Sequence, residues 1–546
     1  MKQVVGKKVA ASESNGVDTD RASQHVADGA GSYFVQPIIE PIEVSIADVV
    51  MDEIVSSEPV DDFVYLDIGS VDRERKVFVE PKVISLTEAP SRAKQHVHAG
   101  DVLVSMTRPN LNAVAQVTQE LHGSIASTGF HVLRSPWLEA GFLYYLVQTD
   151  SFVDAMCGVV QGALYPAVRP RDIDGFKFRL PPRVEQTRIV QKLEELLSDL
   201  DAGVAELKAA QRKLAQYRQS LLKAAVEGAL TADWRATRAQ SGKPQETGAA
   251  LLQRILTERR TRWETKQLAK FAEQGKTPPK DWKEKYDEPA IAESANLPEI
   301  PKDWTWASIE QIASDERYSL AIGPFGSNLK VPDYRDEGVP LVFVRNIRSG
   351  NYGGDYTKFV TAKKASELSA HGIQPGDVLI TKMGEPPGDA DVYPDDQPPA
   401  VITADCIKVR CEREIMQARF LVAVINSSIG RQQIKPITQG VAQKKVSLGR
   451  FSLIAVPLPS MEEQHEICAR LIDVSKEIDA QSAAVEHSLN QSAAQRKNIL
   501  KAAFAGQLVP QDPNDEPASA MLERIRAAKV EHAGNAKPVA KRGRKA

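Results

Sequence analysis

The segment "SLLKAAVEGAL" (220–230) returns almost unchanged as "NILKAAFAGQL" (498–508). Leu222 in the first segment and Leu500 in the second are 278 positions apart. One phrase at two distant places indicates either chance or a duplicated half, and further matches at the same spacing would decide between them.

Two more pairs of segments keep this spacing to within two positions. "LPPRVEQTRIV" (180–190) aligns with "LPSMEEQHEIC" (458–468) at 278 positions, and "GDVLVS" (100–105) aligns with "GDVLIT" (376–381) at 276. A period this long exceeds that of solenoid repeats. The sequence therefore predicts two copies of one half, each with a globular part followed by a helix.

Each half ends in a segment that has the start and stop signals of a long helix, and the first such helix is expected over 183–227. Prolines stand where each helix begins and glycines, Gly228 and Gly506, where it ends. Apolar residues recur every seven positions between them, with Ile189, Leu196, Val204 and Tyr217 as alternates. The predicted seam consists of Leu193, Leu200, Leu207, Leu214, Leu221, Leu471, Ile478, Val485 and Ile499. Heptads predict a coiled coil, either an antiparallel pair within the chain or a homodimeric zipper.

Short β-type runs bounded by turn signals precede each helix, including "DDFVYLDI" and "PLVFVRNI". The predicted fold class is α/β, with two mixed α/β domains separated by two long antiparallel coiled-coil helices in a pseudo-twofold internal repeat. The expected segments are a disordered leader (1–32), the first α/β domain (33–180), the first spacer helix (181–232), a short helix with a linker (233–296), the second α/β domain (297–457), the second spacer helix (458–510), and a short helix with a basic disordered tail (511–546).

Composition narrows the class of protein. The 546 residues are 42% hydrophobic and carry a formal net charge of −3, so any nucleic-acid binding must come from local basic patches. The four cysteines form no CxxC pair, which argues against a zinc site or a disulfide framework. This cysteine usage fits a reducing cytoplasm, and with no long apolar run we expect no membrane partner.

Several loops of the α/β domains carry cationic and amide side chains. Arg and Lys suit guanine edges, Asn and Gln suit adenine edges, and all can hold phosphate. Asn112 lies in the same loop as Arg108, and Arg171 lies in the same loop as Arg169. The candidate DNA-binding residues are Arg108, Asn110, Gln161, Tyr165, Arg169, Asn328, Lys330, Arg345, Asn346, Arg348, Lys382, Gln439, Gln443, Lys444 and Lys445. For any one of these residues, the alternative is a solvated surface side chain that does not bind DNA.

Signatures of catalysis are missing from the sequence. It contains no GxxxxGK[ST] loop, no GxGxxG turn, and no HExxH or GxSxG motif. We therefore predict no catalytic, metal or cofactor-binding residues in this chain. Asp67 with "ERK" (74–76) or "EPK" (80–82) crudely resembles the acidic residues and lysine of a metal-dependent nuclease, and the second half lacks the pattern. A self-contained nuclease is thus one alternative function, and a coiled-coil scaffold is another.

The doubled "LPPRVEQTRIV…LLKAAVEGAL" and "LPSMEEQHEIC…ILKAAFAGQL" segments resemble the two helical spacers of the specificity subunit of type I restriction–modification enzymes. "LPEIPKDWTW" (297–306), "GPFGSNLK" (323–330) and "GDVLITKMGEPPGDA" (376–390) resemble a target recognition domain of that family, in the expected order. The first half lacks the P-x-x-W start and the GPFGS turn. The resemblance covers about residues 33–530.

The resemblance implies a non-catalytic subunit that binds a bipartite double-stranded DNA target. Each α/β domain would read one half-site, and the paired helices would fix the gap between half-sites. Two modification subunits would bring S-adenosylmethionine and methylate a flipped adenine. Two restriction subunits would use ATP and Mg²⁺, so this chain itself would bind no cofactor.

Overall fold

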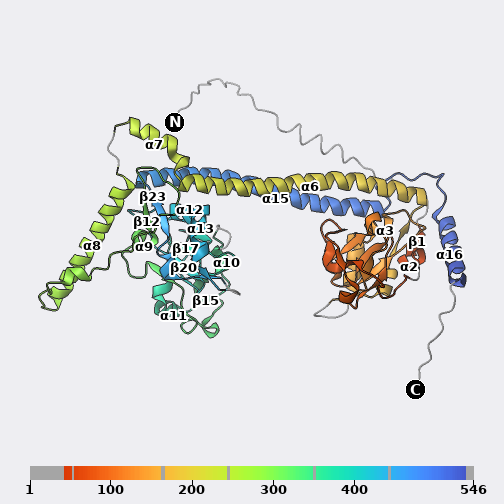
Figure 1. Cartoon of the computed structure of the whole chain (residues 1–546), viewed down its shortest axis with the longest axis horizontal. Coiled ribbons are helices and arrows are strands. Elements are labelled where there is room, and N and C mark those ends of the chain that lie inside the picture. The colour runs from red at the N-terminus through yellow and green to blue at the C-terminus, as the bar shows by residue number, and fades with distance from the viewer. Residues whose placement is uncertain are drawn as a thin grey trace, which may run out of the picture. The chain divides into compact units, whose positions relative to one another are not determined.

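The computed structural model describes residues 42–51, 54–160, 166–242, 246–347, 352–440 and 444–535. These residues divide into two compact units (Figure 1). Unit 1 consists of residues 1–207 with 487–546, and unit 2 consists of residues 208–486. Each unit contains a mixed α/β region, which confirms the predicted fold class at this level. No helix of the described residues is long and apolar enough to cross a membrane.

The α/β region of unit 1 contains three main β-sheets. Their strand orders are β1-β11, β10-β7-β8 and β5-β2-β9-β6. The strands are β1 (Ile42–Ser45), β2 (Phe63–Leu66), β3 (Val71–Asp72), β4 (Val77–Phe78), β5 (Lys82–Ile84), β6 (Ala93–His96), β7 (Val102–Ser105), β8 (Val114–Gln116), β9 (Ile125–Ser127), β10 (Phe130–Leu133) and β11 (Lys177–Leu180). The short helices are α2 (Ile46–Val49), α3 (Phe142–Leu146), α4 (Asp150–Gly158) and α5 (Pro170–Asp174).

Unit 2 has corresponding sheets with orders β12-β23, β13-β20-β17-β18 and β15-β14-β19-β16. Its strands are β12 (Thr305–Ser308), β13 (Leu320–Ile322), β14 (Val339–Val342), β15 (Phe359–Val360), β16 (Gly372–Ile373), β17 (Val378–Thr381), β18 (Ala390–Val392), β19 (Ala400–Ile402), β20 (Cys406–Val409), β21 (Thr438–Gln439), β22 (Lys445–Val446) and β23 (Ala455–Leu458). The short helices of the α/β region are α9 (Ile309–Ile312), α10 (Val344–Ile347), α11 (Ala362–Glu367), α12 (Ala418–Asn426), α13 (Ser428–Ile437) and α14 (Leu448–Phe451). Helices α7 (Ala232–Gln240) and α8 (Gly248–Glu273) precede it.

The "GDV" phrase of each half forms the same buried ion pair. Arg134 Nε donates to Asp101 Oδ1 at 2.7 Å in unit 1, and Arg410 Nε donates to Asp377 Oδ1 at 2.8 Å in unit 2. Both members of the pair shift by 276 positions between the units. The aspartates follow glycines with φ of +93° and +86°, a conformation that favours glycine. The phrase therefore recurs because it builds the start of a central strand.

Two helices of 44 residues each, α6 (Arg183–Val226) and α15 (Met461–Phe504), confirm the long helices that the heptads predicted. Each begins just after a proline turn. Each ends before a glycine in the left-handed region, Gly228 at φ +79° and Gly506 at φ +73°. A shorter helix, α16 (Ala518–Asn535), follows α15.

In unit 1 the first part of α6 and the last part of α15 share one hydrophobic core, which includes Leu193, Leu197, Leu500 and Ala503. An ion pair between Arg496 and Asp201 at 2.9 Å lies at the edge of this contact. The paired stretches run in opposite directions because later positions of α6 meet earlier positions of α15.

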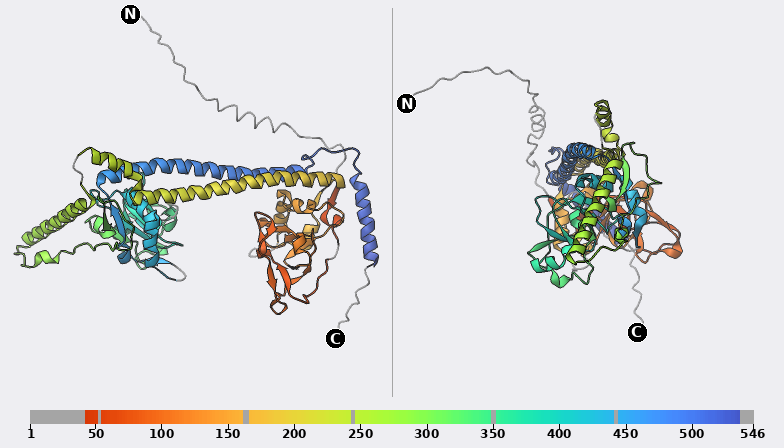
Figure 2. Two further views of the ribbon diagram at one scale, coloured as in Figure 1. Left: turned by 45° about the horizontal axis from the view of Figure 1, so that its top comes forward. Right: turned by 90° about the vertical axis from the view of Figure 1, so that its left-hand side faces the viewer.

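In unit 2 the last part of α6 and the first part of α15 share another core. Leu221, Ala225, Leu471 and Ile478 contribute to it, and Arg218 forms an ion pair with Asp479. The two stretches lie side by side in Figure 1 and in the left view of Figure 2. Long helices with apolar seams of this kind are consistent with a coiled coil.

Burial along the predicted seam is uneven. Leu193, Leu221, Leu471 and Ile478 are buried, whereas the remaining predicted seam residues are half-buried, namely Leu200, Leu207, Leu214, Val485 and Ile499. Tyr217, expected as an alternate seam residue, is 54% exposed, and that expectation was wrong. A pair of helices covers only one narrow stripe of each, so residues beside the stripe stay in solvent where no α/β region packs on them.

A buried glutamine joins each long helix to its α/β region. Gln186 Nε2 donates to the carbonyl of Pro181 at 3.0 Å, and its Oε1 accepts from the backbone N–H of Glu139 at 2.9 Å. Gln464 makes the same two bonds in unit 2, to Pro459 at 3.2 Å and from Gln417 at 2.8 Å. Both glutamines are fully buried.

We predict that Gln186→Ala lowers the free energy of unfolding by about 2 kcal/mol, because it removes a fully buried amide and leaves the backbone N–H of Glu139 without its acceptor. Chemical denaturation followed by circular dichroism measures this change. Gln191→Ala, on an exposed position of the same helix, is the control and should change stability little. Equal effects of the two variants would contradict the role given to Gln186.

Candidate nucleic-acid interface

In unit 2 the predicted lysines gather where β17 ends. The backbone N–H of Val446 donates to the carbonyl of Lys382 at 3.1 Å, and Met383 forms a β-bridge with Lys445. Lys444 forms an ion pair with Glu385 on the opposite loop. The β21–β22 hairpin and the loop after β17 therefore bring Lys382, Lys444 and Lys445 to one place.

The "GPFGSNLK" loop joins the same end of the sheet. Gly323 N donates to the carbonyl of Cys406 at 3.1 Å. A Cβ on Gly323 would lie 1.9 Å from the carbonyl oxygen of Thr403, so only glycine allows this close approach. Asn328 and Lys330 of this loop are exposed. Their side chains are available to a ligand of unit 2.

A third loop of unit 2 contains the predicted residues Arg345 and Asn346, of which one is exposed and the other has a structural role. Arg345 is exposed, and its guanidinium stacks over the Phe343 ring at 4.6 Å. Asn346 is only 4% exposed, because its Oδ1 accepts from Phe343 N at 3.0 Å and its Nδ2 donates to the Gly353 carbonyl at 2.8 Å. Asn346 therefore shapes the loop, and its assignment to DNA contact was wrong. Arg348 lies outside the described residues.

Gln439 lies exposed on β21. With its amide suitably turned, its side-chain oxygen accepts from Arg450 NH1 at 2.7 Å. Arg450 is an exposed cation that the sequence analysis missed. Gln443, which was expected in the same hairpin, lies outside the described residues.

Unit 1 presents its loop through the same backbone contact. Val168 N donates to the carbonyl of Met106 at 2.9 Å, as Val446 does to Lys382 in unit 2, and Thr107 bridges Ala167. Beyond this contact the predicted Arg108 and Asn110 are exposed, and Arg169 is half-buried. Gln161 and Tyr165 lie outside the described residues.

The backbone around Arg108 is strained. Arg108 and Asn112 have φ of +49° and +42°, in the left-handed region that residues other than glycine seldom adopt. The carbonyl of Asn112 accepts from Lys76 Nζ at 2.6 Å, and burial lowers the pKa of Lys76 to about 8. Such strain is concentrated at functional sites and supports a role for this loop.

Glu385 is a second residue that sequence reasoning missed, because "GEPPGD" was interpreted only as a turn. The Lys444 ammonium holds the pKa of this carboxyl below its usual range, so Glu385 is ionised at neutral pH. A carboxylate among lysines can accept from the cytosine amino group. The glycines, prolines and acidic residues of "GEPPGD" are typical of a turn, so nothing in the sequence indicated that Glu385 could contact a base.

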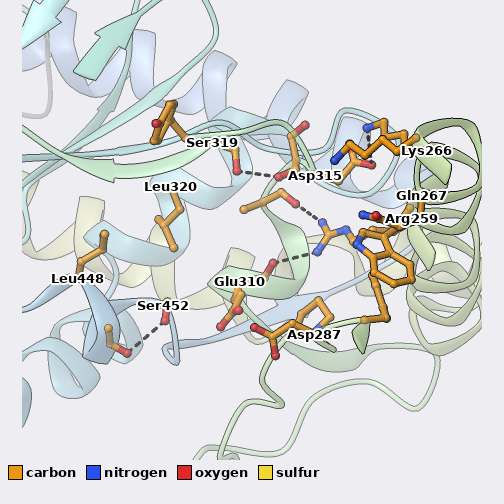
Figure 3. Close-up of a pocket in the computed structure, with 18 of the residues that line it drawn as sticks. Arg259, Lys266, Gln267, Asp287, Glu310, Asp315, Ser319, Leu320, Leu448 and Ser452 are labelled. Carbon is orange, nitrogen blue, oxygen red and sulfur yellow. Dashed lines mark hydrogen bonds and ion pairs between the residues drawn. The ribbon is translucent and has the colours of Figure 1, made fainter. Parts of the chain in front are cut away.

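A larger cleft, of about 970 Å³, lies elsewhere in unit 2 (Figure 3). Arg259 of α8 reaches into its wall and donates to the carbonyls of Glu310 at 3.2 Å and Gln311 at 3.3 Å. None of the described DNA candidates lines this cleft. Its arginine ties α8 to α9 and has a structural role.

The alternative of a nuclease site at Asp67 has a simpler explanation. Its carboxylate accepts from the backbone N–H of Ser70 at 2.8 Å and caps a short 3₁₀ turn (Ile68–Ser70). Among the described residues, no cluster of three or more His, Cys, Asp or Glu side chains could hold a metal ion.

Residues 348–487 match the family model described as "Type I restriction modification DNA specificity domain". The EcoKI specificity subunit of Escherichia coli strain K12 is 21% identical over 485 residues, which cover 85% of this chain and 87% of that protein. The chain resembles the specificity subunits of type I restriction enzymes. The EcoBI specificity subunit of Escherichia coli is 24% identical over 65% of this chain and 65% of its own length, slightly under two thirds.

A solved structure shares the fold. A chain from "Structural basis underlying complex assembly and conformational transition of the type I R-M system" matches with a TM-score of 0.60 and 20% identity, over 87% of this chain and all of that one. These relatives confirm the predicted resemblance. Each of the two curated relatives is named as the specificity subunit of a type I restriction enzyme.

We predict that the double variant Lys444→Ala with Lys445→Ala binds DNA more weakly. The plot of log affinity against log salt should become less steep by about 2, since each phosphate contact contributes about −0.9 to its slope. Fluorescence anisotropy with a labelled duplex across a salt series measures both quantities. Lys276→Ala with Lys280→Ala removes the same charge from exposed positions after α8 and is the control. An unchanged salt slope in the first variant would remove this loop from the interface.

Proposed function

We propose that this chain is the DNA sequence-specificity subunit of a type I restriction–modification complex and binds a bipartite double-stranded target. The observation that carries the proposal is the shared loop frame. In each unit one equivalent backbone contact presents cationic and amide side chains. The contact joins Met106 and Val168 in unit 1, and Lys382 and Val446 in unit 2. Two similar frames with different loops suit a target with two different half-sites.

The division of labour follows from this proposal. Each α/β region reads one half-site in double-stranded DNA, and the long helices set the gap between half-sites in a pseudo-twofold arrangement. Half-site spacing is a geometric consequence of where a protein holds its reading elements. The spacing does not require this chain to perform any chemistry.

Partner subunits supply the reactions. Two modification subunits carry S-adenosylmethionine and methylate an adenine in each half-site, which requires the base to leave the duplex. Two restriction subunits use ATP and Mg²⁺ for translocation and cleavage. This chain decides where both activities occur.

Methylation mapping tests the proposal. In a host that expresses this chain with its modification subunits, we expect one new bipartite motif, with modified adenine in both blocks and a fixed gap. The same host without this chain is the control and should lack the motif. No new modification from a complex shown to be assembled would overturn the proposal.

A further inference from the structure

A second, smaller cleft of unit 2 lies away from the DNA candidates. Its volume is about 280 Å³, and its lining includes Lys408 and Arg410 of the β20 region together with Arg317 and Tyr318 before β13. Strand β17 (Val378–Thr381) lies between Asp377, which binds Arg410, and Lys382 of the loop cluster described above. The two sites are therefore at opposite ends of this strand.

Lys408 is an unusual residue for the floor of a cleft. It is only 2% exposed and lies on the central strand β20, paired with Leu379 of β17. Its Nζ donates to the carbonyl of Gly372 at 2.7 Å. An ammonium group has three N–H donors, and a buried lysine is costly unless a counter-charge accompanies it. Within the described part of the chain, Lys408 forms no direct ion pair, while Asp377 acts on it only from a distance.

The other half of the chain shows that the fold does not need this lysine. Val132 of β10 occupies the corresponding register position, paired with Leu103 of β7, and is 4% exposed. The neighbouring ion pair is present in both units, as Asp101 with Arg134 and as Asp377 with Arg410. Lys408 is thus an added charge on a frame that folds with valine in its place.

The rim of the cleft adds a second cation, Arg317, for which the described part of the chain provides no ion pair. Arg410 is held by Asp377 at 2.8 Å and by Glu316 at 2.9 Å, so its charge is matched. Arg317 is exposed and stacks over the Tyr318 ring at 4.6 Å. Tyr318 is 43% exposed and has φ of +65°, a strained conformation for a bulky residue.

We propose that this cleft binds a small oxyanion, a phosphate or carboxylate group, between the Lys408 ammonium on the floor and the Arg317 guanidinium on the rim. The exposed hydroxyl of Ser369 and amide of Gln374 provide further polar groups at the cleft. Charged donors in a partly desolvated site bind oxyanions more strongly than neutral donors. The ligand neutralises the Lys408 ammonium, a buried cation that forms no ion pair among the described residues.

Equilibrium dialysis of the full chain with radiolabelled sulfate, at fixed ionic strength, tests the site. We expect one saturable site in the wild type, at least tenfold weaker binding in Lys408→Val, and severalfold weaker binding in Arg317→Ala. Lys363→Ala, which removes an exposed lysine of α11, is the control and should bind sulfate normally. Circular dichroism shows whether Lys408→Val is folded, and Arg317→Ala, on an exposed position, provides a second test if it is not.

Competition identifies the source of the anion. Displacement of sulfate by millimolar inorganic phosphate supports a phosphorylated ligand, and displacement by acetate supports a carboxylate. Absence of a saturable site in the wild type, or an unchanged site in Lys408→Val, would overturn the proposal. Tenfold weaker duplex binding by Lys408→Val, with sulfate binding intact, would also overturn it by assigning Lys408 to the DNA interface.

The proposal also predicts a pH dependence. Burial lowers the pKa of Lys408 to about 8 against the opposing effect of Asp377, with Arg410 lowering and Glu316 raising it further. Arg317 and Tyr318 also face the cleft. Sulfate keeps its charge across this range, so its binding should weaken as pH rises through 8 and Lys408 loses its proton. Binding that stays constant from pH 7 to 9 would contradict the role of Lys408.

Discussion

A buried side-chain amide at the start of each long helix is the interaction on which the rest of the structure depends. Gln186 and Gln464 each bond the proline turn before the helix and a backbone N–H of the α/β region. A glutamine can make both bonds at once because its amide has a donor and an acceptor. The direction in which each helix leaves its α/β region is thereby fixed by two hydrogen bonds of a fully buried side chain.

Equivalent contacts also recur within the two α/β regions. The ion pair of Asp101 with Arg134 and that of Asp377 with Arg410 hold equivalent strands, and the Met106 and Lys382 carbonyls hold equivalent loops. Loops on the surface vary more readily than the strands that carry them. A frame kept in both halves with loops that differ is a physical basis for reading two different DNA sequences.

Much of this architecture could be predicted from the sequence because it depends on local, repeated signals. Prolines, glycines and heptads located both long helices to within a few residues. The loop residues were harder. Asn346 looked like a base reader, yet its amide completes a turn through a carbonyl seven residues away. Whether an amide faces a ligand or its own backbone depends on loop geometry, which composition does not encode.

Burial of single side chains could not be predicted from the sequence for a similar reason. Lys408 lies in "ADCIKVR", where alternation gives no sign that a lysine is 2% exposed, and only the register match with Val132 reveals it as an addition. Tyr217 kept the heptad spacing but lies beyond the narrow contact between two helices. In both cases burial is decided by neighbours distant in sequence.

The central claim is that two similar halves of one chain read two separate blocks of DNA. Selection of binding sites from a pool of random duplexes, by the chain in complex with its modification subunits, tests it most directly. The account predicts two conserved blocks with one fixed gap, with Arg108→Ala degrading one block and Lys445→Ala the other. A single undivided block, or a gap that varies in length, would contradict it.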